Sequence, residues 1–354
     1  MPGNRSELVA LATAVPRYVM SQAEVAERTR RVFGLKMPEF DRLAPVFDNA
    51  GIAKRHSVRP GAWYEEPHTW TDRTAVYLEA ATELFVAATR KALSRAGLNA
   101  GDIDAIVTVS STGIAAPSLE ARAASELGIG QHVLRVPVFG LGCAGGVAGL
   151  SIASRLAEAR PGTNVLLVAV ELCTLAVRLD QLTKANIVAL ALFGDGAAAA
   201  IVRAGGGMPA LAGLAGGGDH TWPHTLDVMG WNVDGQGFGV IFDRSIPPFA
   251  HANLALALDG ILSRLHHRRS DIGRFVCHPG GQKVIEAIET ALHLTPEALD
   301  HERAVLADYG NMSAPTALFV LERALAAGLP ETSLLMALGP GFTLSTVLLC
   351  GPRA

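Results

Sequence analysis

A spacing of 169 residues relates the second half of this 354-residue chain to the first. Leu93-Ser94-Arg95 returns as Leu262-Ser263-Arg264, and the difference between their positions is 262 − 93 = 169. The same spacing joins Asp102-Ile103 to Asp271-Ile272, and Leu166-Leu167-Val168 to Leu335-Met336-Ala337. Each match is short, but a constant spacing through helix, turn and strand indicates duplication. We therefore predict two homologous α/β halves, residues 1–205 and residues 206–354.

One segment of the first half combines a strand, a sharp turn and a helix. Val133–Phe139 is alternating and β-branched, which predicts a strand, and Gly140-Leu141-Gly142 follows it. Cys143 comes next, and Ala144–Ala159 has apolar residues at helical spacing. The cysteine is therefore expected at the positive end of a helix, where the pKa of a thiol can fall from ~8.5 to ~3.5–7.5. A thiolate placed in this way is a candidate nucleophile.

The same turn matches another motif. Gly140-x-Gly142-x-x-Gly145 fits the dinucleotide-binding fingerprint, and the next predicted strand, 164–170, is followed by the acid Glu171. The turn at the repeat-related position, Gly310-Asn311-Met312, lacks this fingerprint. A turn common to both halves is structural in origin, so the repeat weighs against a nucleotide loop. A dinucleotide-binding module remains the alternative from a different functional class.

The rest of the chain alternates helices and strands. A long buried helix is expected to end at Arg95, with Thr71 or Asp72 as its cap. Residues 204–219 are glycine-rich without a helical pattern after them, which predicts a linker. Residues 231–242 read as a hairpin with an Asp-Gly turn. The other predicted helices are 252–267, 283–292 and 315–327, and the other strands are 7–15, 104–110, 197–202, 274–277, 334–338 and 345–349.

The repeat brings three chemically active residues to one seam. In the repeat, the Cys143 turn is equivalent to the turn that holds Asn311, and Ser111 is equivalent to Gly280. His278 then follows the strand equivalent to 104–110. All three are expected at strand ends or helix starts that face the boundary between the halves.

A cysteine with a histidine and an asparagine suits acyl transfer through a thioester. The thiolate would accept an acyl group from a carrier thiol, with His278 as base and then as donor. Asn311 and His278 would both direct donors at a carbonyl oxygen and stabilise the enolate formed when a malonyl thioester loses CO2. Each residue also has a structural explanation, since a buried cysteine can pack, and a histidine or asparagine can serve a turn or a cap.

Composition restricts partners and compartment. Apolar residues make up 49% of the chain and charged residues 18%, which favours a large core and a substantial subunit interface. The net charge is −3 without a basic run, so nucleic acid is not expected as a partner. We expect no export signal, no membrane-spanning segment and a cytoplasmic location. The four cysteines form no C-x-x-C pair and no metal-ligand spacing is present, so reduced thiols and no metal are predicted.

Five motifs resemble the type III polyketide synthases, the chalcone synthase family. The similarity runs over nearly the whole chain in the right order, and the motifs HPGG and GNMS are specific. Ketosynthase III shares the Cys-His-Asn set but not usually those two motifs, and it is the alternative within the same chemistry. The five are Gly142-Cys143, Phe193-Gly194-Asp195-Gly196-Ala197-Ala198, His278-Pro279-Gly280-Gly281, Gly310-Asn311-Met312-Ser313 and Gly339-Pro340-Gly341.

The resemblance implies a thiolase fold, a five-layered αβαβα sandwich of two duplicated halves, as a homodimer. It implies Cys143 as the acyl-carrying nucleophile and His278 with Asn311 as the decarboxylation and oxyanion pair. Phe193 would be an aromatic gate between the CoA tunnel and the cavity, which Ser313 would also line. The substrates would be malonyl-CoA and an acyl-CoA starter, with no metal or bound cofactor.

Departures from the plant enzymes suggest the starter. Val240 stands near the second aromatic gate, and Ala337 and Leu338 replace glycine and phenylalanine of a cavity motif. Cys173 stands where the plant enzymes have a threonine. In this respect the chain resembles bacterial enzymes that accept fatty acyl starters. Ala116 and Ala176 are likewise small, so we expect a tunnel for a long aliphatic starter, with products of the alkylpyrone or alkylresorcinol type. Lys283, one turn past HPGG, is the predicted contact for the CoA phosphates.

Overall fold

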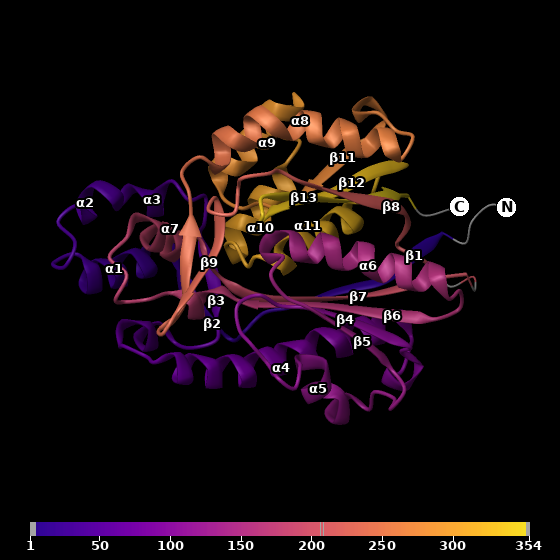
Figure 1. Cartoon of the computed structure of the whole chain (residues 1–354), viewed down its shortest axis with the longest axis horizontal. Coiled ribbons are helices and arrows are strands. Elements are labelled where there is room, and N and C mark those ends of the chain that lie inside the picture. The colour runs from indigo at the N-terminus through magenta and orange to yellow at the C-terminus, as the bar shows by residue number, and fades with distance from the viewer. Residues whose placement is uncertain (1–4, 206, 208, 352–354) are drawn as a thin grey trace.

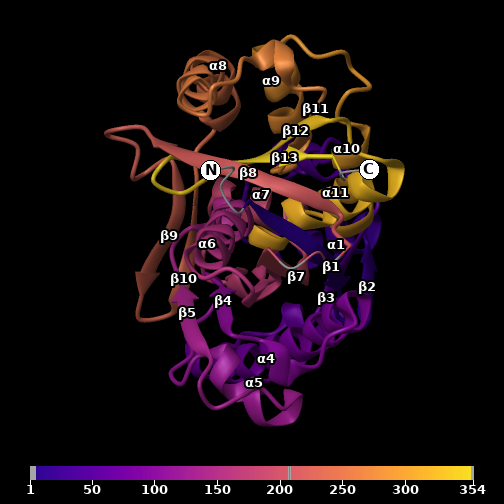
Figure 2. The ribbon, with the colours of Figure 1, turned by 90° about the vertical axis from the view of Figure 1, so that its right-hand side faces the viewer.

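The computed structural model describes residues 5–205, 207 and 209–351. Figures 1 and 2 show five layers, in which two sheets enclose a pair of central helices and each sheet carries helices on its outer face. The predicted αβαβα sandwich is confirmed. Within the described residues, no helix is long and apolar enough to cross a membrane.

The first half supplies the lower sheet and its helices in Figure 1. Its strands lie in the order β5-β4-β6-β7-β1, with β4, β5 and β6 parallel and β7 antiparallel to both neighbours. Helices α4 and α5 cover the outer face, and α6 covers the inner face. The elements are β1 Ser6–Ala14, α4 Trp70–Ala96, β4 Ala105–Val109, α5 Leu119–Leu127, β5 Leu134–Val138, α6 Gly145–Ala159, β6 Asn164–Leu172 and β7 Asp195–Ala204.

The second half repeats this plan with one strand fewer. Its strands lie in the order β11-β12-β13-β8, with α8 and α9 outside and α11 inside. Helix α10, Asp300–Tyr309, stands in the chain where the first half has β5. The other elements are β8 Ala212–Thr221, α8 Ile246–Arg264, β11 Arg274–Cys277, α9 Gln282–Leu292, α11 Ala314–Ala327, β12 Thr332–Gly339 and β13 Thr343–Cys350.

The predicted spacing relates the starts of matching elements. Helix α6 begins at Gly145 and α11 at Ala314, and 314 − 145 = 169. Strands β4 and β11 begin at Ala105 and Arg274, which are also 169 residues apart. The sheets meet where β1 and β8 pair over only three residues each, so hydrogen bonding joins all nine strands at one edge.

Two predictions about elements are wrong. The glycine-rich stretch 204–219, expected as a linker, contributes most of strand β8. A Cβ on Gly217 would lie 2.3 Å from the carbonyl oxygen of Thr346 in the neighbouring strand, so close packing accounts for this glycine. Helix α4 is capped by Thr69, whose side chain accepts a hydrogen bond from Asp72, rather than by Thr71 or Asp72.

The central helices approach each other closely. A Cβ on Gly146 of α6 would lie 2.1 Å from the carbonyl oxygen of Ala314, the first residue of α11. The two helix starts therefore meet backbone to backbone. Apolar residues from both sheets and both helices surround this contact and form one buried core, which includes Val147, Leu150, Leu318, Leu167 and Leu335.

Segments outside the repeat lie at one end of the sandwich (Figure 1). A hairpin of β9 and β10 leaves the second half and extends to the first, and it corresponds to the hairpin predicted at 231–242. The remaining segments are β2 Tyr18–Ser21, α1 Gln22–Phe33, α2 Phe40–Leu43, α3 Pro45–Asp48, β3 Lys54–Ser57, α7 Lys184–Leu192, β9 Met229–Asp234 and β10 Gly237–Phe242.

Candidate active site

Cys143 lies on a sharp turn between β5 and α6, as predicted. The turn is one short 3-10 turn, Gly142–Ala144, and the helix follows at once. Gly142 has φ 46°, and a Cβ there would lie 2.8 Å from the ring of Pro340. The local backbone and this close approach both favour glycine. The turn holds Cys143 with 8% of its surface exposed.

His278 follows the end of β11 in the second half. Its backbone N–H donates to the carbonyl of Met336, and its own carbonyl accepts from Gly280. The residue is 4% exposed, and neither ring nitrogen has a hydrogen-bond partner among the residues that the structure describes. Both nitrogens are therefore available to a substrate, whereas buried polar side chains are usually satisfied within the protein.

Asn311 is fixed from both ends of its amide. Its Nδ2 donates to the carbonyl of Gly280 at 3.0 Å, and its Oδ1 accepts from the backbone of Ser313 at 2.8 Å. Ser313 has φ 58° and ψ −128°, a backbone conformation that residues with a side chain seldom adopt. The strained serine and the amide thus support each other at the start of α11.

The three residues converge through these contacts. The side chains of Ser313 and Asn311 lie near enough to the Cys143 thiol to favour its ionised form by hydrogen bonding. Asn311 is tied to Gly280, whose Cα faces the His278 ring, since a Cβ built on Gly280 would lie 3.7 Å from Nε2. Residues from both halves therefore meet at the seam where the repeat predicted them.

The protonation states differ from those expected of a cysteine at a helix start. Burial raises the pKa of the Cys143 thiol to about 11, and the Glu171 carboxyl acts in the same direction. Burial also lowers the pKa of His278 to about 3. The expected preference for the thiolate is wrong here, because the loss of hydration outweighs the hydrogen bonds of Ser313 and Asn311. At neutral pH the site holds a thiol and a neutral imidazole.

A cavity next to Cys143 contains four of the predicted substrate residues. It has about 420 Å³ of space outside atoms, part of which is open to solvent. Cys173, Phe193, Val240 and Ser313 line it with Cys143. The other lining residues are Gly142, Met229, Gly230, Trp231, Ile241, Phe242 and Pro340.

Four other predicted residues do not line this cavity. Ala116 is exposed on the protomer surface. Ala176 and Leu338 are 3% and 5% exposed and pack in the interior. Lys283 is exposed in the first turn of α9, so its ammonium is solvated as expected of a phosphate contact. The prediction that Ala116, Ala176 and Leu338 wall the same space as Cys143 does not hold for this cavity.

Trp231 is a wall residue that the sequence did not single out. Its indole Nε1 donates to the carbonyl of Ser111 at 2.8 Å, which ties the hairpin to the end of β4. Its ring meets Phe193 edge to face, with centroids 6.2 Å apart. The hairpin itself was predictable, but the direction of its tryptophan depends on a contact with the other half.

Glu171 has a structural role that differs from a ribose ligand. The carboxyl is fully buried and accepts from the backbone of Ser111 and the hydroxyl of Thr112. Burial raises its pKa to about 8. The glycines of the fingerprint serve the elbow and the contact of α6 with α11. The dinucleotide alternative thus loses the features on which it was based.

The described residues also contain no group of three or more His, Cys, Asp and Glu side chains that could hold a metal ion. The candidate site is therefore built from a thiol, an imidazole and an amide.

Two copies of one α/β half, stacked on their inner helices, define the thiolase class of folds. Family models identify the family within this class. The chalcone and stilbene synthase N-terminal domain matches residues 3–206, and the C-terminal domain of the same family matches residues 217–351. The chain therefore belongs to the chalcone and stilbene synthase family and is a type III polyketide synthase.

Curated relatives agree with this assignment. A 1,3,6,8-tetrahydroxynaphthalene synthase from Streptomyces peucetius is 38% identical and covers 97% of this chain and 93% of its own length. A 3,5-dihydroxyphenylacetyl-CoA synthase from Streptomyces toyocaensis is 33% identical over 97% of this chain and 90% of its own. An alpha-pyrone synthesis polyketide synthase-like protein from Mycobacterium tuberculosis is 30% identical over 96% and 89%.

Solved structures match along the same length. The tetrahydroxynaphthalene synthase of Streptomyces coelicolor, a bacterial type III polyketide synthase, superposes with a TM-score of 0.93 at 32% identity, covering 98% of this chain and all of that one. The type III domain of Steely1 from Dictyostelium gives 0.92 at 27% identity over 99% and 100%. The prediction of a polyketide synthase is confirmed at the level of family, fold and enzyme class.

Proposed function

We propose that this enzyme extends a fatty acyl-CoA starter with malonyl-CoA and closes the product to an alkylpyrone or alkylresorcinol. The observation that carries the proposal is the convergence of Cys143, Asn311 and His278 beside a largely apolar cavity. Loading would begin with a neutral pair, so His278 accepts the thiol proton as sulfur attacks the starter thioester. The new Cys143 S–C bond forms, the CoA S–C bond breaks, and CoA leaves as a thiol with that proton.

Extension would use the amide and the imidazole as donors. Malonyl-CoA loses CO2, and the electrons of the broken C–C bond form an enolate whose oxygen faces Asn311 and His278. Preorganised donors of this kind stabilise a developing oxyanion by ~2.7–4 kcal/mol each. The enolate carbon attacks the acyl carbonyl, and the Cys143 thiolate leaves. Burial favours these steps, because a water-poor site strengthens the donors and protects the intermediate.

The starter class is supported by the cavity walls. Cys173 and Val240 line the cavity next to Cys143 with small side chains. The name of the Mycobacterium tuberculosis relative refers to alpha-pyrone synthesis. Trp231 favours a second candidate, a small acyl starter, because its indole packs beside Phe193 and fills part of the cavity wall. The relative described as a tetrahydroxynaphthalene synthase is the more similar of the two.

Mass spectrometry of products from acetyl- to palmitoyl-CoA with malonyl-CoA tests the proposal. Long-chain pyrones or resorcinols are the expected products. Products made only from acetyl-CoA or malonyl-CoA would favour the second candidate. Cys173→Phe adds bulk next to Cys143 and is expected to remove the long-chain products first.

The proposal includes a homodimer and no bound cofactor beyond the CoA thioesters. Strand β5 ends the sheet with an open edge, and Ile114, Leu134 and Phe139 near it are 54%, 53% and 56% exposed. A second copy would cover this apolar edge. Lys283 is proposed as a contact for the CoA phosphates. The cytoplasmic location and the boundary between halves at residue 205 remain predictions.

A further inference from the structure

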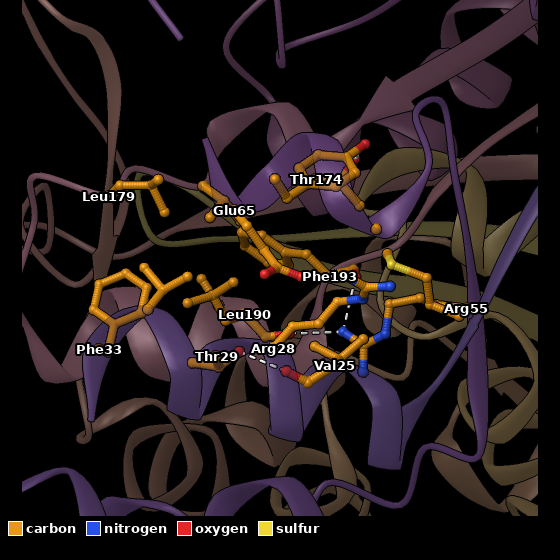
Figure 3. Close-up of a pocket in the computed structure, with 16 residues that line it drawn as sticks. Val25, Arg28, Thr29, Phe33, Arg55, Glu65, Thr174, Leu179, Leu190 and Phe193 are labelled. Carbon is orange, nitrogen blue, oxygen red and sulfur yellow. Dashed lines mark hydrogen bonds and ion pairs between the residues drawn. The ribbon is translucent and has the colours of Figure 1, made fainter. Parts of the chain in front are cut away.

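The C-terminal end of α7 is held by two groups from distant parts of the chain, the side chain of Arg55 and the backbone of Asn311. We propose that Arg55 is a positioning residue for decarboxylation, because it fixes the end of α7 to which Asn311 is bonded and so sets the direction of the Asn311 amide. This inference rests on the proposed function, in which that amide stabilises the enolate oxygen. Figure 3 shows Arg55 bonded to the backbone of Leu190 and Phe193.

The last four carbonyls of α7, the group that a helix end leaves without partners in the next turn, all accept hydrogen bonds. The Arg55 guanidinium binds two of them, and the backbone N–H of Asn311 binds the last. Arg55 and Asn311 therefore cap the same helix end. The bonds are Ala189 with the Phe193 N–H at 2.8 Å, Leu190 with Arg55 at 2.8 Å, Ala191 with Arg55 at 2.9 Å, and Leu192 with the Asn311 N–H at 2.8 Å.

The backbone of Asn311 is bonded on both sides to the residues that end and follow α7. Its N–H donates to Leu192, and its carbonyl accepts from the N–H of Gly194 at 3.0 Å. The two segments also approach closely, since a Cβ on Gly194 would lie 2.3 Å from the carbonyl oxygen of Tyr309, and a Cβ on Gly310 would lie 2.7 Å from that of Leu192. A displacement of the α7 end is therefore passed directly to Asn311.

The planar guanidinium of Arg55 holds several acceptors at fixed angles. Its Nη1 donates to the carbonyls of Leu190 and, at 3.0 Å, Phe193. Its Nη2 donates to Ala191 and to the side-chain oxygen of Gln22. The Gln22 amide in turn donates to the Ala191 carbonyl at 3.1 Å. A lysine keeps the charge but has no such fork, so it could not hold these acceptors in the same arrangement.

Arg55 carries its charge in the interior, with 1% of its surface exposed. Burial lowers the pKa of the guanidinium to about 9 and the Asp195 carboxyl opposes that shift, so the group is charged at neutral pH. The negative end of the α7 dipole lies at the same place. An apolar side chain would fill this space without desolvating a charge but would leave the α7 carbonyls without donors, so the arginine serves to fix the helix end.

The two residues that load the acyl group are held by other contacts. The N–H of His278 donates to the carbonyl of Met336 in β12 at 2.9 Å. The turn at Cys143 is held by Ser111, whose Oγ accepts from the N–H of Gly142 at 3.3 Å. A change at Arg55 should therefore impair decarboxylation more than loading.

A matched pair of identical substitutions tests this role. Arg73 is 9% exposed and also donates to two backbone carbonyls, of Val177 at 3.3 Å and of Gln236. Two rates are measured, CO2 release from malonyl-CoA and acylation of Cys143 by whichever of acetyl-CoA and hexanoyl-CoA loads the wild type faster. Arg55→Lys should lower the ratio of CO2 release to acylation at least about tenfold, since a misplacement of about 1 Å can cost ~100-fold in rate. Arg73→Lys should leave the ratio as in wild type.

The ratio separates positioning from stability, because a smaller folded fraction lowers both rates equally. Equal ratios in Arg55→Lys and Arg73→Lys would overturn the inference. If Arg55→Lys does not fold, Gln22→Met removes one acceptor from the guanidinium and should lower the same ratio by about twofold or more. An unchanged ratio in Gln22→Met would then overturn it.

A double variant shows whether Arg55 acts through the amide. Arg55→Lys combined with Asn311→Ala should release CO2 at the rate of Asn311→Ala alone, because residues that act through one another are not additive. Losses that multiply in the double variant would overturn the inference and keep the proposed function. An Asn311→Ala enzyme that releases CO2 at the wild-type rate would instead reject the proposed role of the amide itself.

Discussion

The side-chain nitrogen of Asn311 donates to the carbonyl oxygen of Gly280, 3.0 Å away. Gly280 is two residues beyond His278, so this single bond sets the distance between the amide and the imidazole. With one N–H held by Gly280, the amide of Asn311 has a fixed direction in which its second N–H can be offered to a substrate. The bond therefore orients the proposed oxyanion donors before any substrate binds.

Cys143→Ala is expected to abolish covalent labelling of the enzyme by acyl-CoA. The thiol of Cys143 is the atom that would carry the acyl group. Mass spectrometry of the intact protein after incubation with acyl-CoA measures the mass added by the acyl group.

The wild-type enzyme is also expected not to bind dinucleotides, so NAD and NADP should give no binding heat in calorimetry. Tight dinucleotide binding by a wild type that takes no acyl label would contradict the assignment.

Asn311→Ala and His278→Ala should both stop the release of CO2 from malonyl-CoA, but they should differ in loading. Loss of one oxyanion donor costs ~2.7–4 kcal/mol, or about a hundredfold to a thousandfold in rate. Loading at Cys143 should suffer less in Asn311→Ala, because only His278 accepts the thiol proton. Separate assays of CO2 release and of acyl-enzyme formation check this. An Asn311→Ala enzyme that decarboxylates at the wild-type rate would reject the role of the amide.

Alkylation of Cys143 by iodoacetamide should be slow at neutral pH. Burial raises the pKa of this thiol to about 11, and the thiolate is the reactive form. The rate should therefore rise about tenfold per pH unit between pH 7 and pH 10. Ser313→Ala should lower the rate further at each pH, since the Ser313 hydrogen bond stabilises the thiolate. A rate that levels off below pH 8 would indicate a depressed pKa instead.

Glu302→Gln should stabilise the protein above pH 7. Burial raises the pKa of Glu302 from 4.5 to about 7, while Oε1 accepts from the backbone of Cys277 and Oε2 has no partner within the described chain. The folded state then holds a proton that the unfolded state releases, so stability falls as pH rises from about 4.5 to 7. Glutamine keeps the acceptor and has no such loss. Urea unfolding should give a gain of about 1–3 kcal/mol at pH 8 that vanishes near pH 4.

Phe139→Asp should shift the enzyme toward a monomer. Phe139 is 56% exposed next to the open edge of β5, so a charge there would be buried in a dimer formed through that edge. Light scattering over micromolar concentrations measures the mass. Leu226→Asp, at an 82% exposed leucine away from β5, is the control and should not change it. A wild type that is monomeric throughout would contradict the proposed dimer.

Local patterns predicted the parts of the site that depend on neighbouring residues. The elbow at Cys143 was readable because a strand, a tight turn and a helix follow one another within one segment. The repeat then located Asn311 and His278, since duplication converts a position in one half into a position in the other. These arguments need no knowledge of side-chain contacts.

Contacts between the halves were not readable in the same way. Trp231 belongs to a hairpin that has no counterpart in the first half, so the repeat could not position it. Strand β8 looked like a linker because glycine has low strand propensity, whereas its glycines allow close packing against β13 and α8. The pKa of Cys143 depends on the water excluded by both halves together, which a local argument from the helix end does not include.

The close contact of Gly146 with Ala314 has a consequence for the symmetry of the enzyme. A pseudo-two-fold operation superposes one elbow on the other, yet one copy now carries the nucleophile and the other the amide that faces it. The duplicated halves therefore form one asymmetric site on the pseudo-two-fold axis instead of two equivalent sites. The two turns carry different reactive residues, but their helix starts pack against each other. A bulkier residue at either helix start would therefore displace the turn of the other half as well.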